Sequence, residues 1–584
     1  MKIIKIILVY SFLFTYIFSF NCFAQSNILK EAVKKEMNRT VSELKNEKYP
    51  VYFLSYYITE TMNNQYLSSF GKINYTYPRT SNLKKTRSVD IDLRVGDYKF
   101  DNSHIIRGEY NPFGNLSVFS FLPIEDDEKA IRSVLWDKTD RAYKSAIEAY
   151  EKAISNQAVK IAVEDTSDDF SKELPNKYYE GFRRLVYSKN EALGVENAFI
   201  VDTLHWINVI NRLSSKFKKY SWIYSGDVSF VANLTNKYYI STENSELSFS
   251  APYVRLMISI KTKAEDGSSL PLYKDYFSYS CEGLPDEKLM ESDIDSMIVL
   301  LNELRNANEA ETFTGPAILS GEAAGVFFHE IFGHRVEGHR EKDPAYSHTF
   351  KKSLDKSILP EFMNIVFDPS KKEIDGKEIA GYYKYDDEGQ LGQRVEVVKN
   401  GIFKSYLMSR SPIEKFPKSN GHGRRSAGRS AVARQSNLIV ESNNMKSNQE
   451  LRNLLIAEAK KQNKDYGLLF DKVIGGYTML NRTTINSFNV TPIVVYKIYV
   501  DGRPDELVRG VDLIGTPLTT FSNILATGDK YGIFNGMCGA ESGWVSVSAV
   551  SPSLLVSTIE VQSKSKSQTK LPILPSPINT QEGM

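Results

Sequence analysis

The chain has 584 residues, of which 41% are hydrophobic and 25% charged, a composition typical of a globular protein with ample length for a large core. Its formal net charge is only +2, from 73 basic and 71 acidic side chains. Because nucleic-acid-binding proteins carry a basic excess that is missing here, we expect no nucleic-acid partner.

The first 24 residues have the pattern of a secretory signal peptide. Lys2 and Lys5 precede an apolar run from Ile6 to Phe20, and the small residue Ala24 comes just before Gln25. The run is about 15 residues long, shorter than the ~20 that span a bilayer, although an uncleaved anchor is the alternative. We therefore expect a signal peptide over residues 1–24 and an exported protein, periplasmic or secreted, without stable membrane insertion.

Residues 25–311 are predicted to form an N-terminal α+β domain with an antiparallel sheet. Apolar residues at helical spacing, alternating apolar and polar residues, and turn residues predict the following elements in chain order: a helix over 28–44, strands over 51–57, 72–77 and 89–93, a helix over 126–163, strands within 222–260 and a helix over 286–307. No group of residues in this half has the pattern of a catalytic site.

Residues 312–562 are predicted to form a second domain, in which a metal-binding helix packs on an antiparallel sheet or barrel. A short strand at Ala317–Leu319 leads into this helix, which Ser320 is expected to cap. Further on, Asn400-Gly401 lies between two short apolar runs, the typical sequence of a tight β-hairpin. The last residues, 563–584, are rich in Lys, Ser and Pro and are expected to be disordered.

The helix of the second domain carries the most informative motif, His329-Glu330 followed by His334. A His-Glu pair with a second His nearby is typical of zinc peptidases, in which the imidazoles bind the metal and the glutamate is the general base. Here the histidines are five positions apart, which places them about 140° apart around a regular helix instead of about 40°. A π-type turn would bring them together, and Gly333 would permit such a distortion.

Two histidines do not hold a catalytic zinc, which needs three protein ligands and an open fourth position. The residues leave the third ligand open, with Glu337, His339, His348 and Cys538 as candidates. Cys538 lies in the glycine-flanked stretch Asn535–Gly539, which is expected to be a loop that lets the thiolate reach an ion. A small buried apolar side chain is the alternative interpretation of this cysteine.

An ordered series of short motifs continues through the second half of the chain. Its members are Phe313–Pro316, Gly321–Ala324, His329–His334 with Glu337-Gly338, Tyr385–Gly389, Asn400–Tyr406, Asn420–Arg425, Arg509–Gly515 and Cys538-Gly539. From about Thr312 to Val561, this series resembles the TldD/PmbA family of zinc metallopeptidases.

The resemblance implies that His329, His334 and Cys538 bind Zn²⁺ and that Glu330 activates a water molecule. It also implies an extended, unfolded peptide as substrate, bound beside a strand in a channel between two subunits. The protein would then be a dimer, either of two copies or with a related subunit that lacks the zinc motif. Since this chain keeps the motif, it resembles the catalytic member. It departs from the family at His339, where Asp is usual.

The predicted function is that of a zinc-dependent peptidase that hydrolyses unfolded or small peptides. Arg424, Arg425 and Arg434 are expected to hold a peptide carboxylate, although a solvated basic loop is an equal alternative. The competing hypothesis is a non-catalytic peptide-binding or scaffold protein with a structural zinc. A fourth ligand from His339 would favour that hypothesis, whereas Glu330, which would be no ligand, argues against it.

Overall fold

The computed structural model describes residues 28–577 except 78–84, 107–116, 158–165, 189, 194, 196, 481–487, 516–520, 565–569 and 575. The signal peptide expected over residues 1–24 lies outside the described residues, and so does much of the tail that is expected to be disordered. Of the helices that are described, none combines the length and the apolar character needed to cross a membrane.

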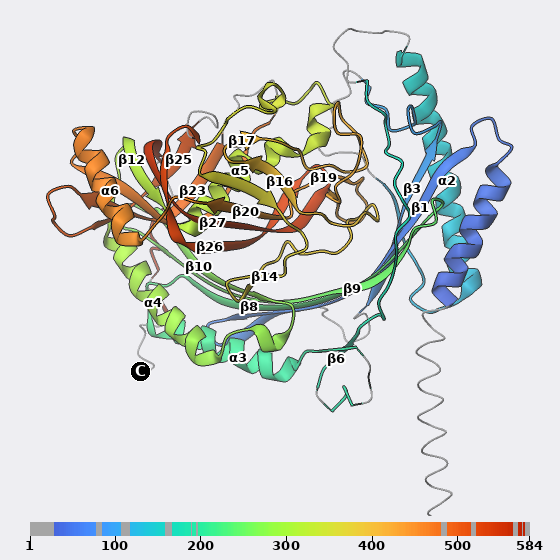
Figure 1. The fold of residues 1–584 in the computed structure, drawn as a ribbon. Helices are drawn as coiled ribbons and strands as arrows, with labels where there is room; N and C mark the ends of the chain where they lie inside the picture. Colours follow the sequence, from blue (N-terminus) through green and yellow to red (C-terminus); the bar gives the residue numbers. More distant parts are fainter. Residues whose placement is uncertain are drawn as a thin grey trace, which may run out of the picture.

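The first half of the chain forms an 8-stranded sheet that curves around the second half (Figure 1). Its main path runs β10-β9-β8-β1-β3-β4, with β2 paired to β1 and β5 to β9. The strands are β1 (Val51–Ser69), β2 (Lys72–Tyr77), β3 (Thr86–Val95), β4 (Val118–Phe121), β5 (Lys177–Tyr179), β8 (Ser225–Ser241), β9 (Glu246–Lys263) and β10 (Ser269–Ser278). All pairs except β5 with β9 are antiparallel, as the sequence predicts.

Helices cover the outer face of this sheet (Figure 1). A helix over residues 28–44 and α2 (Glu128–Gln157) share one core with β1 and β3, and α3 (Thr203–Ser215) and α4 (Glu287–Asn306) share another with β8 and β9. The predicted helix over 286–307 is confirmed, with Asp286 accepting a hydrogen bond from the backbone N–H of Leu289 as its N-cap.

The side chains of β8 and β9 alternate between the two faces of the sheet. Phe230 and Leu256 are fully buried in the core beneath the helices, whereas Arg255 and Met257 line a cavity on the inner face. Because successive side chains of a strand point to opposite faces, one pair of strands both anchors the helices and forms a cavity wall.

The second half forms a 13-stranded sheet with α5 (Gly321–Ile331) and α6 (Asn448–Lys461). Its strands are β11 (Asn308–Glu309), β12 (Phe313–Leu319), β13 (Met363–Phe367), β16 (Val395–Lys399), β17 (Ile402–Phe403), β20 (Asn437–Ser442), β21 (Met445–Lys446), β22 (Tyr466–Thr478), β23 (Phe488–Tyr499), β24 (Glu506–Arg509), β25 (Val511–Gly515), β26 (Ile524–Ala540) and β27 (Gly543–Ser563). Antiparallel pairs predominate, and four pairs are parallel: β12 with β22, β20 with β27, β11 with β24 and β21 with β26. The predicted α+β class is confirmed.

Small elements complete the described fold. They are the strand pairs β6 (Arg184–Val186) with β7 (Ala198–Ile200), β14 (Glu373–Ile374) with β15 (Lys377–Glu378) and β18 (Gly423–Arg424) with β19 (Val432–Ala433), and the 3₁₀ turns η1 (Lys216–Lys219), η2 (Cys281–Gly283), η3 (Gly333–Val336), η4 (Gly338–Glu341) and η5 (Lys351–Ser353). The predicted hairpin at Asn400-Gly401 joins β16 to β17, with φ of 48° and 75° at these two residues.

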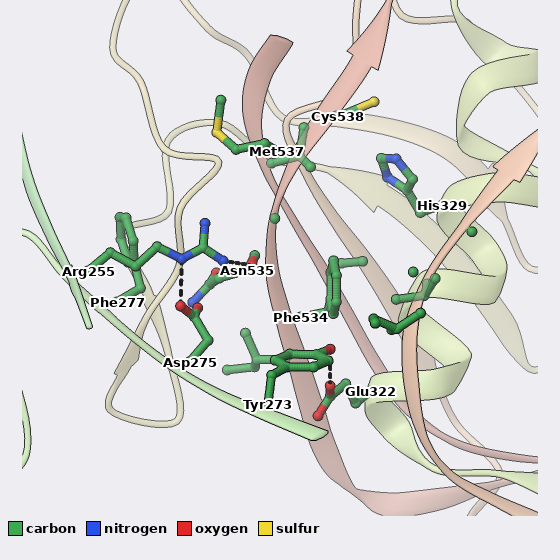
Figure 2. A pocket seen from close by; sticks show the side chains of 18 of the residues that line it. Arg255, Tyr273, Asp275, Phe277, Glu322, His329, Phe534, Asn535, Met537 and Cys538 are labelled. Atoms are coloured by element: carbon green, nitrogen blue, oxygen red, sulfur yellow. Dashed lines mark hydrogen bonds and ion pairs between the residues drawn. The ribbon is translucent and has the colours of Figure 1, made fainter. Parts of the chain in front are cut away.

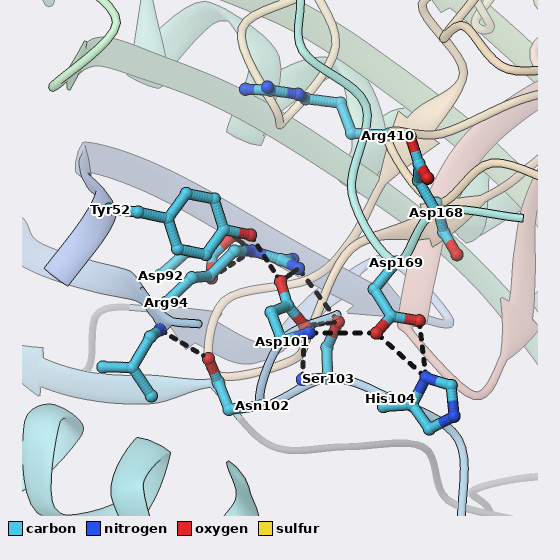
Figure 3. A network of polar contacts seen from close by, with 12 residues as sticks. Tyr52, Asp92, Arg94, Asp101, Asn102, Ser103, His104, Asp168, Asp169 and Arg410 are labelled. Carbon is cyan, nitrogen blue, oxygen red and sulfur yellow. Dashed lines mark hydrogen bonds and ion pairs between the residues drawn. The ribbon is translucent and has the colours of Figure 1, made fainter. Parts of the chain in front are cut away.

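A polar cluster lies where the two halves meet (Figure 3). Arg94 on β3 pairs with Asp101 at 2.9 Å, and the carboxylate of Asp169 accepts from the backbone N–H of Asp101 at 3.0 Å. His104 Nδ1 lies 2.9 Å from Asp169, which Lys342 of the second half also approaches at 3.4 Å. These contacts connect the N-terminal sheet to the segment that follows the His-Glu motif.

Arg410 makes a second buried connection between the halves. Its side chain is 1% exposed, and its guanidinium donates to both carboxylate oxygens of Glu243, at 2.7 and 2.8 Å, and to the carbonyl of Ser171. The guanidinium carbon also lies 3.9 Å from the ring centre of Phe170. A buried ion pair of this kind is costly to break, because the charge left behind has no solvent.

Replacing Glu243 with Ala should lower the free energy of unfolding by about 3 kcal/mol, since Arg410 would remain buried without its carboxylate. Urea unfolding of the purified protein measures this loss. The matched control is Glu441→Ala, which breaks the exposed pair with Arg394 and should cost less than about 1 kcal/mol. Equal losses in the two variants would contradict the assignment of Glu243 as a buried anchor.

Candidate metal centre

Helix α5 buries the His329-Glu330 pair of the motif. Ser320 caps it by accepting from the backbone N–H of Ala323 at 3.2 Å, as predicted. Small residues allow the helix to lie directly on the sheet, since a Cβ at Gly325 would stand 2.7 Å from the carbonyl oxygen of Ala549 on β27. Nearly all residues of α5 are therefore buried, and His329 and Glu330, in its last turn, are only 9% and 7% exposed.

The two motif histidines meet because the helix ends between them. The predicted π-type turn is wrong: α5 ends at Ile331, and the chain continues through Phe332 into the 3₁₀ turn η3. Because the helical path breaks at Phe332, with φ of −119° and ψ of −54°, the angular separation of a regular helix no longer applies, and the ring centres of His329 and His334 lie 5.0 Å apart.

Gly333 has a different role from the one expected. Its φ is not among the positive values, so unusual backbone angles do not explain it. Instead, a Cβ at Gly333 would lie 1.9 Å from the side-chain oxygen of Gln435, so only glycine leaves room for this side chain. The amide of Gln435 in turn donates to the carbonyl of His329 at 3.3 Å.

Cys538 completes the group from the far end of the chain. It lies on strand β26, paired with Val545 of β27, and not in the loop that its flanking glycines suggest. Gly536 and Gly539 instead make room for the rings of Phe534 and Trp544. The Cys538 Sγ is 3.4 Å from His334 Nε2, and one ligand atom from each of His329, His334 and Cys538 lies within 4.8 Å of the others.

This donor set fits a metal ion in both spacing and chemistry. With Zn–S near 2.3 Å and Zn–N near 2.0–2.1 Å, two tetrahedral ligands lie about 3.3–3.6 Å apart, which agrees with the 3.4 Å between Cys538 and His334. Two imidazoles and a thiolate are ligands that zinc accepts readily. His339 and His348 do not join the group, because the Nε2 of His339 contacts Glu541 and that of His348 lies 3.0 Å from the carbonyl of Asp343.

A buried charge network orients two of the three candidate ligands. Glu337, which is fully buried, accepts from His334 Nδ1 at 3.2 Å and from Arg340 at 2.7 Å. This contact fixes the ring so that Nε2 faces Cys538. Arg434 donates to the Sγ of Cys538 at 3.2 Å and to its carbonyl at 2.8 Å, and its Nε lies 3.4 Å from Glu337. Arg340 also binds Glu541 at 2.9 Å.

The network also shifts the pKa values of Cys538, His334 and Glu337. Burial by itself would raise the pKa of the Cys538 thiol, but the positive charges of His334, His329 and Arg434 outweigh it and hold the pKa well below its usual range. Burial opposes the charging of His334, yet Cys538 and Glu337 raise its pKa well above the ordinary value. Burial likewise opposes the charge of Glu337, whose pKa His334 and Arg340 lower to about 2.

Glu330 lies next to this group with its carboxylate toward the cavity. Burial raises its pKa, while the charges of His329 and His334 act in the opposite direction. Strand β22 passes directly against it, since a Cβ at Gly476 would lie 2.7 Å from the Cγ of Glu330. Arg335 holds the end of the helix by donating to the carbonyl of Glu330 at 2.8 Å.

The candidate centre opens into a cavity of about 1750 Å³ between the two sheets (Figure 2). Its walls come from β8, β9 and β10 of the first half and from α5, β22 and β26 of the second. Arg255 crosses it, pairing with Asp275 and donating to the carbonyl of Asn535 at 2.8 Å. Sequence reasoning missed these wall residues and Glu541, because only the folded chain brings them to the centre.

The three arginines expected to hold a peptide carboxylate do not line this cavity. Arg424 donates to the carbonyls of Gln435 and Ser546, Arg425 pairs with Asp90 at 2.8 Å, and Arg434 is fully buried beside Cys538. Their contacts give them structural partners and give no support to the expected substrate contact.

Residues 312–563 match the model of the PmbA/TldA metallopeptidase C-terminal domain. The chain is 28% identical to a metalloprotease of Archaeoglobus fulgidus over 270 residues, 46% of this chain and 57% of that protein. It is 24% identical to the zinc metalloprotease TldD homolog of Saccharolobus solfataricus over 369 residues, 62% of this chain and 75% of that protein. These matches support a place in the TldD/PmbA family.

Solved structures with this fold cover nearly the whole chain. TldE from Thermococcus kodakarensis has a TM-score of 0.56 at 11% identity, covering 90% of this chain and 100% of its own. A Thermotoga maritima protein described as a candidate modulator of a DNA gyrase has a TM-score of 0.57 at 14% identity, covering 91% and 100%. At such identities the likeness concerns the fold alone.

Replacing Glu337 with Gln should weaken Zn²⁺ binding by about 10- to 100-fold, because His334 loses the carboxylate that orients its ring. Competition with a chromophoric chelator measures the dissociation constant. Glu541→Gln is the matched control, since it removes a carboxylate from the same arginine without touching His334, and its effect should be much smaller. Thermal unfolding of both variants separates lost affinity from lost folding. Equal affinities in Glu337→Gln and the unmodified protein would contradict the assigned role.

Proposed function

We propose that this protein is a zinc-dependent peptidase that hydrolyses peptide bonds of unfolded or small peptides. The observation that carries the proposal is the group of His329, His334 and Cys538, whose ligand atoms lie within 4.8 Å of one another. This group stands at the wall of a cavity large enough for a peptide segment, with the carboxylate of Glu330 beside it.

His329, His334 and Cys538 would hold the metal, which when bound supplies Lewis-acid character and makes a water molecule more acidic. Glu330 would then accept a proton at its carboxylate and deliver it to the leaving amine. A carboxyl whose pKa burial has raised is better suited to this exchange than an ordinary glutamate, because it can both take and return a proton.

The alternative of a scaffold protein with a structural metal has less support. It calls for a fourth protein ligand, and His339 was the candidate. Because its Nε2 contacts Glu541, His339 is engaged away from the other three residues. A three-ligand group with an adjacent carboxylate corresponds to the catalytic arrangement, in which one position stays open.

Two strand edges at the cavity suit an extended peptide. Strand β22 pairs with β12 only at Leu468–Phe470, so among the described strands its continuation through Ile474–Tyr477 has a partner, β23, on one side only. This continuation and residues 532–540 of β26 line the cavity. An extended peptide can add to such an edge through main-chain hydrogen bonds.

The proposal extends to location and assembly. The leader-like residues 1–24 favour export to a periplasm or to the medium, and the family resemblance favours a dimer, with a second copy or with a related subunit that lacks the zinc motif. Size-exclusion chromatography with light scattering on the mature protein, and fractionation of the expressing cell, test these two points directly.

The test of the activity is hydrolysis of an unstructured peptide mixture by the zinc-loaded protein beside its Glu330→Gln variant. The unmodified protein should cut, and Glu330→Gln should bind zinc with similar affinity but cut at least about 100-fold more slowly, because the proton acceptor is gone. Removing zinc with a chelator should abolish cutting, and adding it back should restore it. Equal cutting by the two proteins would refute the role of Glu330.

A further inference from the structure

The proposed reaction gives no role to Glu322, one of the carboxylates that line the cavity. This residue begins the first turn of α5, and its side chain lines the same cavity as His329 and Glu330. Figure 2 shows Glu322 and His329 on one helix, with Tyr273 of β10 hydrogen-bonded to Glu322 at 3.2 Å. An acid in the first turn of a helix is favourable in any protein, so its position alone does not indicate a ligand.

The hydrogen bonding of Glu322 is what points to a ligand. Its only hydrogen bond among the described residues comes from Tyr273, whose hydroxyl also lies 2.8 Å from the carbonyl oxygen of Val473. A tyrosine hydroxyl has a single proton, and the carbonyl is the nearer acceptor. The carboxylate can accept about four hydrogen bonds, so its remaining acceptor sites are available to a group that enters the cavity.

The charges nearby compensate the burial of Glu322 only in part. Lys274 and Lys472 act on it electrostatically, but in the part of the chain that the structure describes neither forms an ion pair with it. Lys274 instead pairs with Asp293 at 3.3 Å, and Lys472 also acts on the neighbouring Asp471. Burial raises the pKa of Glu322, while Lys472, Tyr273 and Lys274 act in the opposite direction.

The helix fixes how far this carboxylate lies from the proposed reaction centre. About two turns of α5 separate Glu322 from His329 and Glu330, which corresponds to about 11 Å along the helix axis. An extended peptide advances about 3.3–3.6 Å per residue. A group of the substrate that contacts Glu322 would therefore lie about three residues from the bond that is cut.

We propose that Glu322 forms a cation subsite that binds an ammonium group of the substrate. The inference rests on the proposed peptidase function and specifies its substrate class. The ammonium group has two sources, the free α-amine of a peptide cut about three residues from its end, or the side chain of a lysine closer to the cut. Both would make charge-assisted hydrogen bonds to the carboxylate.

The experiment compares three kinds of unstructured peptide that otherwise lack basic residues: one with a free amino terminus, its N-acetylated twin, and a series of acetylated twins with a single lysine placed at successive positions. Binding is measured by fluorescence anisotropy in the zinc-loaded Glu330→Gln background, where no cleavage interferes. Cleavage rates and fragment masses are measured in parallel with the active protein. Each measurement is repeated with Glu322→Gln, which keeps the acceptor of Tyr273 and removes the charge.

The free-amine peptide, or one lysine peptide, should bind at least about tenfold more tightly than the acetylated twin, as expected for a hydrogen bond to a charged group. Glu322→Gln should reduce this ratio to about one. Preference for the free amine identifies the α-amine as the source, with release of a fragment of about three residues. Preference at one lysine position identifies the side chain. Glu373→Gln, at an exposed acid elsewhere in the cavity, should keep the ratio.

Equal binding of all three kinds of peptide by the unmodified subsite would overturn the inference, whether or not Glu322→Gln folds. A preference that survives Glu322→Gln would overturn it as well. Binding with the expected preference but without cleavage by the active protein would refute the peptidase function and leave the subsite standing. Cleavage without any charge preference would refute the subsite and leave the peptidase function standing.

Discussion

The buried carboxylate of Glu337 is the group on which the candidate metal centre depends. It has no exposed surface, and three charged or chargeable side chains, His334, Arg340 and Arg434, converge on it. An isolated carboxylate could not remain ionised at such a depth, and it does so here because its partners supply the charge that water would otherwise provide. Glu337 thereby orients the imidazole of His334. It also contacts Arg434, which donates a hydrogen bond to the sulfur of Cys538.

The arrangement of the two halves explains why the chemistry lies in a cavity and not on a surface. The second half supplies the helix, the histidines and the cysteine, whereas the first half supplies a wall from the inner face of its curved sheet. Side-chain alternation in β8 and β9 makes this possible, because the same strands bury apolar residues against α3 and α4. Arg255, which reaches across to Asn535, joins the wall to the strand that carries Cys538.

Local patterns in the sequence predicted local structure well. The cap at Ser320, the helix over 286–307 and the hairpin at Asn400-Gly401 all follow from interactions within a few residues. The π-type turn predicted between the two histidines is wrong, because the helix ends at Ile331, and the contact between Gly333 and Gln435 beside it is remote in sequence. The position of the domain boundary near 311 and 312 stays a prediction.

The candidate site also has features that the sequence predicts and features that only the folded chain shows. Its residue types could be proposed from the motif and the family resemblance, but not the partners that orient them, since Glu541 and Arg340 meet only in the folded chain. Cys538 was expected in a loop because glycines flank it, whereas those glycines accommodate aromatic rings of the same hairpin. The expected contact of Arg424, Arg425 and Arg434 with a substrate stays a prediction, and these side chains do not line the cavity.

The distance between the ligands along the chain has a consequence for how the centre forms. His334 and Cys538 are 204 positions apart, and the cysteine lies in the last long hairpin of the described chain. A chain that emerges amino terminus first presents its two histidines long before the thiolate exists, so the three-ligand set can assemble only as one of the final events of folding. An ion bound there would act as a cross-link that closes a very long loop, and the entropy it removes from the unfolded chain grows only slowly with loop length. Binding of the metal by all three residues would thus require that the carboxyl-terminal strands have already folded.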